Sequence, residues 1–542
     1  MNWFIIFLSL INLSVCIYED QIGKFDWRQT YVGRIKFSQF DTVSTAKKII
    51  VATEENVLAA LNLKTGQVVW RHVFENAASG NIQLLHVSDK VVTVTGSNPY
   101  LVRGWDSSTG VLHWEWSMTL DNDETADFSE WWVHQGLLVH MIPVFGSHVE
   151  VTLYNLVTGH NKGTTTKLAA NWSNDRCVFT APYITCPKGD STLIALDIIS
   201  NTVSNKLINP ITYEISETAI RKLEAFEESS IVPGFIVNDN KVIILENNEF
   251  KISPIRLCSP SASITVIDTT AGPLVLQIGE NGQRTCLRAH SLTGVEVPDI
   301  RSDLPSDIPE PVISSAVCTK KDGFVCRLLV TGEDDSVHLM QHGGRILWTR
   351  EEALTNVVAT EFVDLPVSEL DAAIESQFDH KEDSVWSAFS RRLSTQFQQL
   401  SNFIQSLQNA DRQTGDEPSE QLERDYFNLH KVIVLVTGAG KIFGIDNLSG
   451  AILWRRYEPA LNTETALIFT RRSARHPPHS AYVTVVGKHE DTGAGLLVSL
   501  DPITGNLVGE RVLQLDVPLL QCAVLHVADQ ESLHALILLD TE

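Results

Sequence analysis

The fold is decided by the stretch Gly444-IDNLSGAIL-Trp454, whose frame returns in Ala60-LNLKTGQVV-Trp70 and Gly104-WDSSTGVLH-Trp114. In each copy a small residue is followed two positions later by Asp or Asn. Thr or Ser then precedes a Gly, and a Trp stands four residues after that Gly. The Asp or Asn side chain can accept hydrogen bonds from the local backbone, and Gly readily adopts a positive φ. Each copy therefore predicts two β-strands joined by a tight turn.

Weaker copies extend this repeat along the chain. They are Tyr154-NLVTG-His160, Ala195-LDIISN-Thr202, His290-SLTG-Val295, Gly343-GRIL-Trp348 and Ser499-LDPITG-Asn506. The marker Gly or Asn stands at positions 66, 110, 159, 201, 294, 344, 450 and 505, so most steps are 42 to 55 residues and two are about twice as long. A repeat of roughly 40–50 residues made of short strands is typical of a β-propeller blade.

We therefore predict an all-β fold, with one or more β-propellers of four-stranded blades. One long step then contains a degenerate blade and the other an insertion. The repeated Trp side chains are expected to pack between neighbouring blades, because a blade needs its neighbours to bury its faces. The repeated Trp, Asp and Gly residues are accordingly interpreted as structural, not catalytic.

Composition narrows the function classes. The 542 residues include 42 Lys and Arg against 66 Asp and Glu, a formal charge of −24, which argues against a duplex-binding protein with a broad basic surface. No G-x-S-x-G, H-E-x-x-H, Walker or Rossmann motif occurs in a suitable context. We therefore expect no enzymatic activity, no cofactor, no metal site and no nucleic-acid partner.

The N-terminus predicts entry into the secretory pathway. Residues Trp3 to Val15 form a short apolar run, and Ser14 and Cys16 are small residues before a possible cleavage site. This pattern indicates a signal peptide over residues 1–16; the alternatives are a buried first strand or a short anchor. No later run approaches the roughly 20 apolar residues of a spanning helix.

Two closely spaced cysteine pairs stand out in the mature part. Cys177 and Cys186 flank a predicted turn at Ala181-Pro182, and Cys318 and Cys326 flank one at residues 321–323. Each turn would place its two cysteines opposite one another, within disulfide reach in an oxidising lumen. Ordinary buried thiols are the alternative; zinc is less favoured because the chain has no C-x-x-C.

Two N-glycosylation sequons fit the same compartment, Asn171-Trp-Ser173 and Asn447-Leu-Ser449. Asn171 is the better acceptor of the two. Asn447 lies inside a repeat turn, where close packing would hinder the transferase.

The β pattern stops between Asp364 and Asn428. An acidic stretch leads into residues 384–408, where apolar side chains recur mostly at steps of three and four, which predicts an amphipathic helix of about six turns. Such a helix can face a core or lie at a membrane interface or in a groove of partner helices. The side chains expected at a membrane or partner interface are Trp386, Phe389, Leu393, Phe397, Leu400 and Phe403.

The predicted domains follow from these features. They are a signal peptide over 1–16, propeller blades over 17–365 that could belong to two propellers, a helical insertion with an acidic linker over 366–427, and further blades over 428–542.

Several segments resemble the large luminal subunit of the endoplasmic reticulum (ER) membrane protein complex, its subunit 1. They are Tyr18-EDQIGKFD-Trp27 with Arg28-QTYV-Gly33, Lys48-IIVATEENVLAALNLKTGQVVWRHV, Leu347-WTREEAL, and Arg424-DYFNLHKVIVLVTGAGKIFGI-Asp446. The resemblance implies a non-enzymatic luminal scaffold in a complex that inserts and folds transmembrane segments. Other subunits, the membrane interface and client membrane proteins would then be its partners. Members of this family are close to twice as long and carry a single span near the C-terminus, so we interpret this chain as a fragment, truncated gene model or short isoform.

A second resemblance gives the alternative function. The frame A-x-D-x-x-T-G-x-x-x-W is similar to the tryptophan-docking repeat of quinoprotein-type eight-bladed propellers, which would suit a secreted dehydrogenase or ligand-binding module. The quinone enzymes carry an adjacent Cys-Cys pair, however, and this sequence has none.

Overall fold

The structure is a computed structural model that divides into two compact units. It describes residues 27–42, 47–74, 80–119, 129–203, 209–215, 219–282, 284–305, 308–320, 323–367, 422–425, 427–474, 479–509 and 512–540. One unit is Thr30–Asn356; the other joins Met1–Gln29 to Val357–Glu542. Almost all described elements are antiparallel strands, which confirms the predicted all-β fold.

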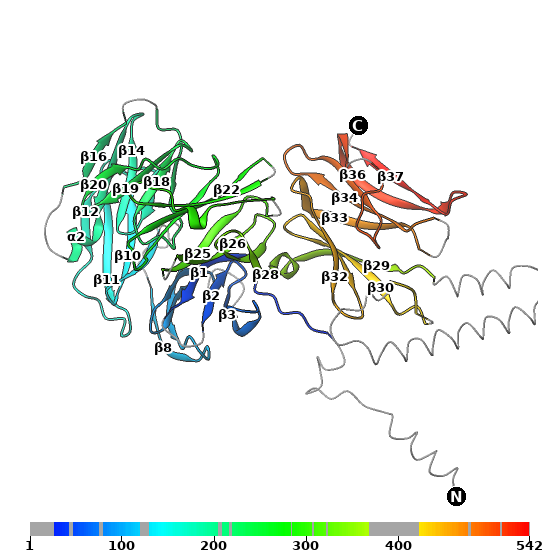
Figure 1. Ribbon diagram of the computed structural model, residues 1–542, viewed down its shortest axis with the longest axis horizontal. Coiled ribbons are helices and arrows are strands. Elements are labelled where there is room, and N and C mark those ends of the chain that lie inside the picture. Colours follow the sequence, from blue (N-terminus) through cyan, green and yellow to red (C-terminus); the bar gives the residue numbers. More distant parts are fainter. Residues whose placement is uncertain are drawn as a thin grey trace, which may run out of the picture. The chain divides into compact units, whose positions relative to one another are not determined.

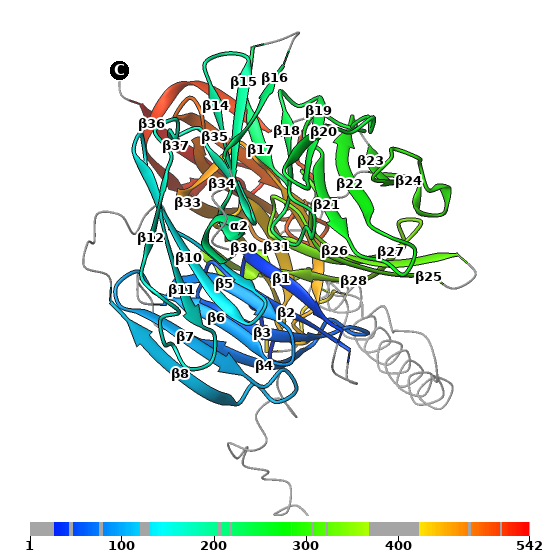
Figure 2. The same ribbon diagram turned by 90° about the vertical axis from the view of Figure 1, so that its left-hand side faces the viewer.

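The unit Thr30–Asn356 contains seven four-stranded sheets, each made of four consecutive strands (Figures 1 and 2). The first four sheets are β1 (Ile35–Asp41), β2 (Lys48–Thr53), β3 (Val57–Asn62), β4 (Val68–Val73); β5 (Ile82–Val87), β6 (Val91–Thr95), β7 (Tyr100–Trp105), β8 (Leu112–Met118); β9 (Glu130–His134), β10 (Leu137–Val144), β11 (His148–Asn155), β12 (Thr166–Ala169); and β13 (Val178–Thr180), β14 (Tyr183–Lys188), β15 (Thr192–Asp197), β16 (Ile211–Glu214).

The other three sheets are β17 (Leu223–Ala225), β18 (Gly234–Val237), β19 (Lys241–Glu246), β20 (Glu249–Ile252); β21 (Ser263–Ile267), β22 (Leu274–Asn281), β23 (Arg284–Ser291), β24 (Ser302–Pro305); and β25 (Val312–Lys320), β26 (Phe324–Thr331), β27 (Ser336–Gln341), β28 (Ile346–Glu351). The described residues of this unit also include three short helices: α2 (Ile198–Val203) between β15 and β16, η3 (Pro298–Ile300) between β23 and β24, and η4 (Glu352–Thr355) after β28.

The seven sheets close into a ring. The first strand of the first blade, β1, contacts both β5 of the second blade and β25 of the last. Buried side chains fill each space between neighbouring blades; between the last and first blades they include Ile49, Leu61, Leu329 and Leu339. Each blade thus hides both faces against its neighbours, as a propeller requires. The degenerate blade expected between positions 201 and 294 is β17–β20.

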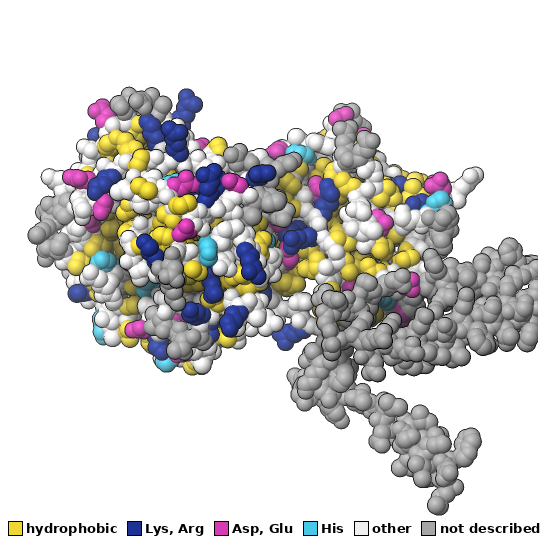
Figure 3. Space-filling model, in the orientation of Figure 1, with side chains coloured by type: hydrophobic (Ala, Val, Ile, Leu, Met, Phe, Trp, Pro, Cys, Tyr) yellow, Lys and Arg dark blue, Asp and Glu magenta, His cyan; other side chains and the backbone are white. Residues whose placement is uncertain are grey.

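The unit Val357–Glu542 contains two further blades (Figure 1). They are β29 (Val357–Asp364), β30 (Lys431–Thr437), β31 (Lys441–Asp446), β32 (Ile452–Tyr457), and β33 (Leu461–Arg472), β34 (Tyr482–His489), β35 (Ala494–Leu500), β36 (Leu513–Ala528), β37 (His534–Asp540). Their shared core includes Val434, Val436, Val483 and Val485, all of them buried. Hydrophobic side chains are not confined to this core: Figure 3 also shows some on the surface of the unit.

The domain limits differ from those that the sequence suggested. We expected the first group of blades to run to residue 365, but the first unit ends at Asn356. The reason is that β29 pairs along its length with β30, across the insertion, and so belongs to the second unit. The residues between Asp364 and Lys431 therefore interrupt a blade between its first and second strands.

Candidate functional site

The repeat turns have the predicted chemistry. In the turn after β7, Asp106 Oδ1 accepts hydrogen bonds from the backbone N–H groups of Ser108 (2.9 Å) and Thr109 (3.0 Å). Gly110 follows at φ +73°. The N–H of Thr109 is the largest cause that lowers the pKa of Asp106 to about 2. The Asp106 carboxylate therefore stabilises the turn by accepting hydrogen bonds from its backbone.

Trp70 of β4 docks on this turn. Its indole N–H donates to the carbonyl of Ser107 at 3.0 Å, and a Cβ on Gly110 would lie only 2.7 Å from Cδ2 of the indole. The glycine is thus required twice, for its positive φ and for the space that the ring occupies.

The same contact recurs at four other turns, and in each the accepting carbonyl lies three residues before the glycine. Trp116 lies against Gly159 and donates to Leu156, Trp348 against Gly66 to Leu63, Trp454 against Gly505 to Pro502, and Trp27 against Gly450 to Asn447. The four tryptophans that come from strands, Trp70, Trp116, Trp348 and Trp454, thus pack between neighbouring blades, as the repeat predicted.

Trp114 makes a different contact from the five docked tryptophans. Its ring lies against Gly104, directly opposite it in the same blade, and packs against the buried cluster shared by the second and third blades. Strand β8 continues to Met118, and side chains two residues apart lie on the same face of a strand. Trp116, on the same face, is the side chain of β8 that docks on the turn of the next blade.

Two of the remaining repeat turns differ from the tryptophan frame. The turn expected at Asp197–Asn201 is replaced by the short helix α2, in which Ser200 N–H donates to Asp197 Oδ1 at 2.9 Å. At Gly294 the docked ring is that of Pro254, whose Cγ would lie 2.3 Å from a Cβ on the glycine.

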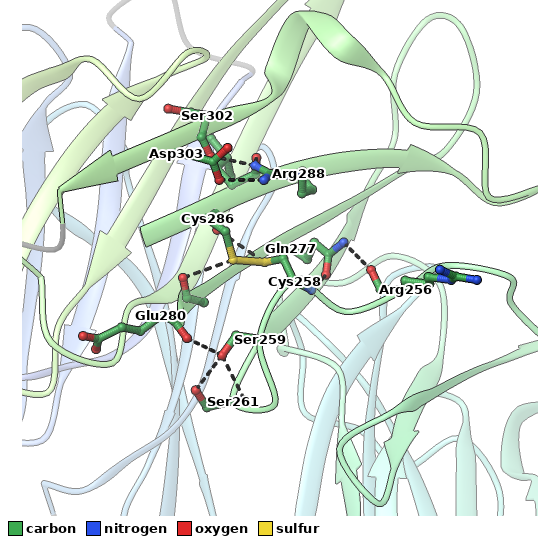
Figure 4. The surroundings of a disulfide bond; sticks show 12 residues. Arg256, Cys258, Ser259, Ser261, Gln277, Glu280, Cys286, Arg288, Ser302 and Asp303 are labelled. Carbon is green, nitrogen blue, oxygen red and sulfur yellow. Dashed lines mark hydrogen bonds and ion pairs between the residues drawn. A yellow bond between two sulfur atoms is a disulfide. The ribbon is translucent and has the colours of Figure 1, made fainter. Parts of the chain in front are cut away.

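Pro254 belongs to the strap, which we define as residues 253–262 between β20 and β21. Figure 4 shows how the strap is fastened: a disulfide joins its Cys258 to Cys286 of β23. Beside this bond, the buried Gln277 accepts from the backbone N–H of Cys258 at 3.1 Å, and Ser259 Oγ donates to the carbonyl of Glu280 at 2.5 Å. One disulfide and two hydrogen bonds thus hold the strap against the blade β21–β24.

Both cysteine pairs singled out in the sequence are also bonded, Cys177 to Cys186 and Cys318 to Cys326. The second pair lies directly opposite across β25 and β26. Sequence reasoning missed the third bond, because Cys258 and Cys286 are 28 residues apart and no single hairpin relates them. The sequence offered one indication of this bond: Cys258 and Cys286 were both left without a predicted partner.

The sequons differ in accessibility. The side chain of Asn171 is exposed. The amide of Asn447 is used at both ends: Oδ1 accepts from Lys431 N–H at 2.8 Å and Nδ2 donates to the carbonyl of Leu429 at 2.8 Å. The six side chains of the expected interface, Trp386, Phe389, Leu393, Phe397, Leu400 and Phe403, lie outside the described residues.

The centre of the seven-bladed ring holds a cavity of about 940 Å³. Strands β1, β5, β9, β13 and β25 line it, with residues 225–233. Its carboxylates include Glu130, Glu227 and Glu228, and burial raises the pKa of each, to about 7 for Glu227 and Glu228. Lys36 lowers the pKa of Glu130 and Glu228, and Ser263 Oγ donates to Glu227 at 2.9 Å.

This cavity was not expected from the sequence, because its residues come from blades far apart in the chain. Its charge would favour a cationic group over an anionic one. Among the described residues, no group of three or more His, Cys, Asp and Glu side chains is arranged to hold a metal ion. The same residues include no helix that is long and apolar enough to cross a membrane.

Comparisons with known proteins cover both units. Residues 16–131 and 115–352 match the family described as EMC1 N-terminal beta-propeller domain, and residues 428–542 match ER membrane protein complex subunit 1, second beta-propeller. The ER membrane protein complex subunit 1 of Xenopus laevis is 26% identical over an alignment of 639 residues that covers 100% of this chain and 64% of that protein. That of Gallus gallus is 25% identical over 629 residues, covering 98% and 64%.

Solved structures resemble the chain more distantly. The computationally designed Ika8 protein matches 62% of this chain and 92% of its own, at 14% identity and a TM-score of 0.34. The Cps50 (Swd1) beta-propeller domain of Myceliophteria thermophila matches 57% and 96%, at 12% identity and a TM-score of 0.34. The family matches and the two relatives do establish the family: the chain, which spans 64% of the length of those relatives, belongs to the family of ER membrane protein complex subunit 1.

Proposed function

We propose that this chain is a non-enzymatic scaffold subunit of the ER membrane protein complex. In this role it lies in the ER lumen, is associated with the membrane, which the full-length form is expected to cross once, and supports the insertion and folding of transmembrane segments. The observation that carries the proposal is the family match over both units, together with relatives that are named as subunits of a membrane protein complex.

The use of the polar repeat residues supports a scaffold. The carboxylate of Asp106 is occupied by backbone N–H groups of its own turn, and Asp446 serves the equivalent turn, where Ser449 N–H donates to it at 3.1 Å. These carboxylates therefore stabilise the turns on which Trp70 and Trp27 dock. A ring stabilised in this way offers large, fixed surfaces to partners.

The insertion supplies the surface that we expect to meet lipid or partner helices. Its predicted helix over 384–408 carries the apolar face with Phe397 and Phe403, and Gln398 and Asn402 stand on the opposite face of the same helix. Because an aspartate on an apolar interface must be desolvated, charge on the first pair disrupts a buried interface, whereas charge on the second pair stays in water.

The experiment compares two double variants in the full-length form, in its native cells. We expect Phe397→Asp with Phe403→Asp to lower the recovery of co-purifying subunits and the insertion of a client membrane protein. Gln398→Asp with Asn402→Asp is the matched control and should leave both unchanged. Normal recovery and normal insertion with the phenylalanine variant would refute this role for the helix.

A further inference from the structure

Trp27 docks on the blade β29–β32 in the same way that the strand tryptophans dock on their neighbours. Its indole N–H donates to the carbonyl of Asn447 at 2.8 Å, and a Cβ on Gly450 would lie 2.4 Å from its Cδ2. For Trp348 on the blade β1–β4, the corresponding distances are 3.2 Å to the carbonyl of Leu63 and 2.8 Å to a Cβ on Gly66.

Trp27 differs from the other docked tryptophans in the part of the chain that it comes from. The other four docked tryptophans, Trp70, Trp116, Trp348 and Trp454, come from the fourth strand of a blade, β4, β8, β28 or β32. Trp348 has a special place among them, because it comes from the last blade and docks on the first. It therefore closes the seven-bladed ring.

Trp27 occupies the equivalent place in the second unit. It docks on β29–β32, the first blade of that unit along the chain, yet it comes from a position 420 residues before its partner. No blade precedes β29–β32 within that unit's described residues, so the contact that a preceding blade would make is made by the N-terminal segment.

The turn that accepts the indole of Trp27 is also held by hydrogen bonds that do not involve Trp27. Asn447 is fixed by both ends of its amide, as described above. The neighbouring Asp446 accepts from Ser449 N–H at 3.1 Å and contacts His430 Nε2 at 2.8 Å, with both side chains of the Asp446–His430 pair about nine-tenths buried. A turn whose carbonyl is already aimed outward loses little entropy when it accepts the indole N–H.

We propose that Trp27 is the closing tryptophan of the second propeller, so that the chain's N-terminal segment belongs to the same ring as residues 357–542. The seven-bladed ring over 30–356 is then an insertion into the second one. It follows that the N-terminal segment must wait, undocked, until residues 431–457 have been made and folded. The first ring has no such dependence, because each of its blades is made of consecutive strands.

The test is native-state hydrogen exchange on the full-length form within its assembly, comparing the wild type with Trp27→Ala and with the matched variant Trp348→Ala. Loss of a docked tryptophan should speed exchange about 100-fold in the blade that receives it. We expect Trp27→Ala to do this in Lys441–Tyr457 and to leave Val57–Val73 unchanged. Trp348→Ala should give the reverse.

A milder variant keeps the test informative if Trp27→Ala does not fold. Trp27→Phe retains an aromatic ring against Gly450 but cannot donate to Asn447, so exchange in Lys441–Tyr457 should rise by only about fivefold, the equivalent of one hydrogen bond. The proposal is overturned if Trp27→Phe and Trp27→Ala leave that segment at the wild-type rate. It is equally overturned if either variant loosens the blade β1–β4 instead.

Discussion

Substituting Gly110 with Ala tests whether the docked tryptophan, or only the turn, makes the repeat glycine necessary. A left-handed conformation costs a residue with a Cβ about 1–2 kcal/mol. Gly110 has φ +73°, so Gly110→Ala carries this cost. The new Cβ would also stand 2.7 Å from Cδ2 of Trp70, and overpacking of this kind costs about 1–3 kcal/mol more. We therefore expect a loss of about 2–5 kcal/mol in the free energy of unfolding.

Gly136 is the matched control, because it has φ +75° but nothing within 4 Å of where its Cβ would stand. Gly136→Ala should cost only the conformational part, about 1–2 kcal/mol. Urea unfolding of the purified chain, followed by circular dichroism, measures both. In a Trp70→Ala background the cost of Gly110→Ala should fall to that of Gly136→Ala, because the clash is gone. Equal losses for the two glycines in the wild-type background would refute the reasoning.

Three other predictions concern the glycans, the cavity and the strap. Asn171→Gln should remove one glycan and increase gel mobility, whereas Asn447→Gln should not change it, because the Asn447 amide is engaged at both ends. Burial raises the pKa of Glu227 to about 7, so the folded state binds the proton of this carboxyl group more tightly than the unfolded chain does. The Tm should therefore fall as pH rises from about 4.5 through 7. Glu227→Gln should make that decline in Tm smaller. Replacing Cys258 and Cys286 with Ala opens a loop spanning 28 residues and should cost about 3–4 kcal/mol in urea unfolding, more than removal of either hairpin disulfide.

The turns were predictable because their chemistry is local. Within the stretch Gly104–Trp114, one Asp and one Gly determine the hydrogen bonds and the sign of φ, and the structure has both. Cys318 and Cys326 were predictable for the same reason, since a short turn places them opposite one another. Spacing alone then indicated blades, because the turns recur at a blade's length.

Contacts between blades were less predictable, since they depend on how far a side chain reaches across a gap that the sequence does not describe. Trp114 fits the frame better than Trp116, yet it is Trp116 that docks on the glycine turn of the next blade. Pro254 has no resemblance to a docking tryptophan and still fills the same place. The place of Glu227 in the central cavity could not be predicted for a related reason, because the other residues that line the cavity come from blades far apart in the sequence.

The place of the insertion explains how a propeller can gain a new surface without losing its ring. Asp364 ends β29 and Lys431 begins β30; the two residues are paired in register, and their side chains form an ion pair at 2.8 Å. The ends of the insertion are therefore held together by the blade itself. The entropic cost of closing a loop grows only slowly with its length, so many residues can be added there at small cost to the fold. Because such a position tolerates added residues, we propose that the predicted helix of the insertion, and not the blades, makes the membrane or partner contacts.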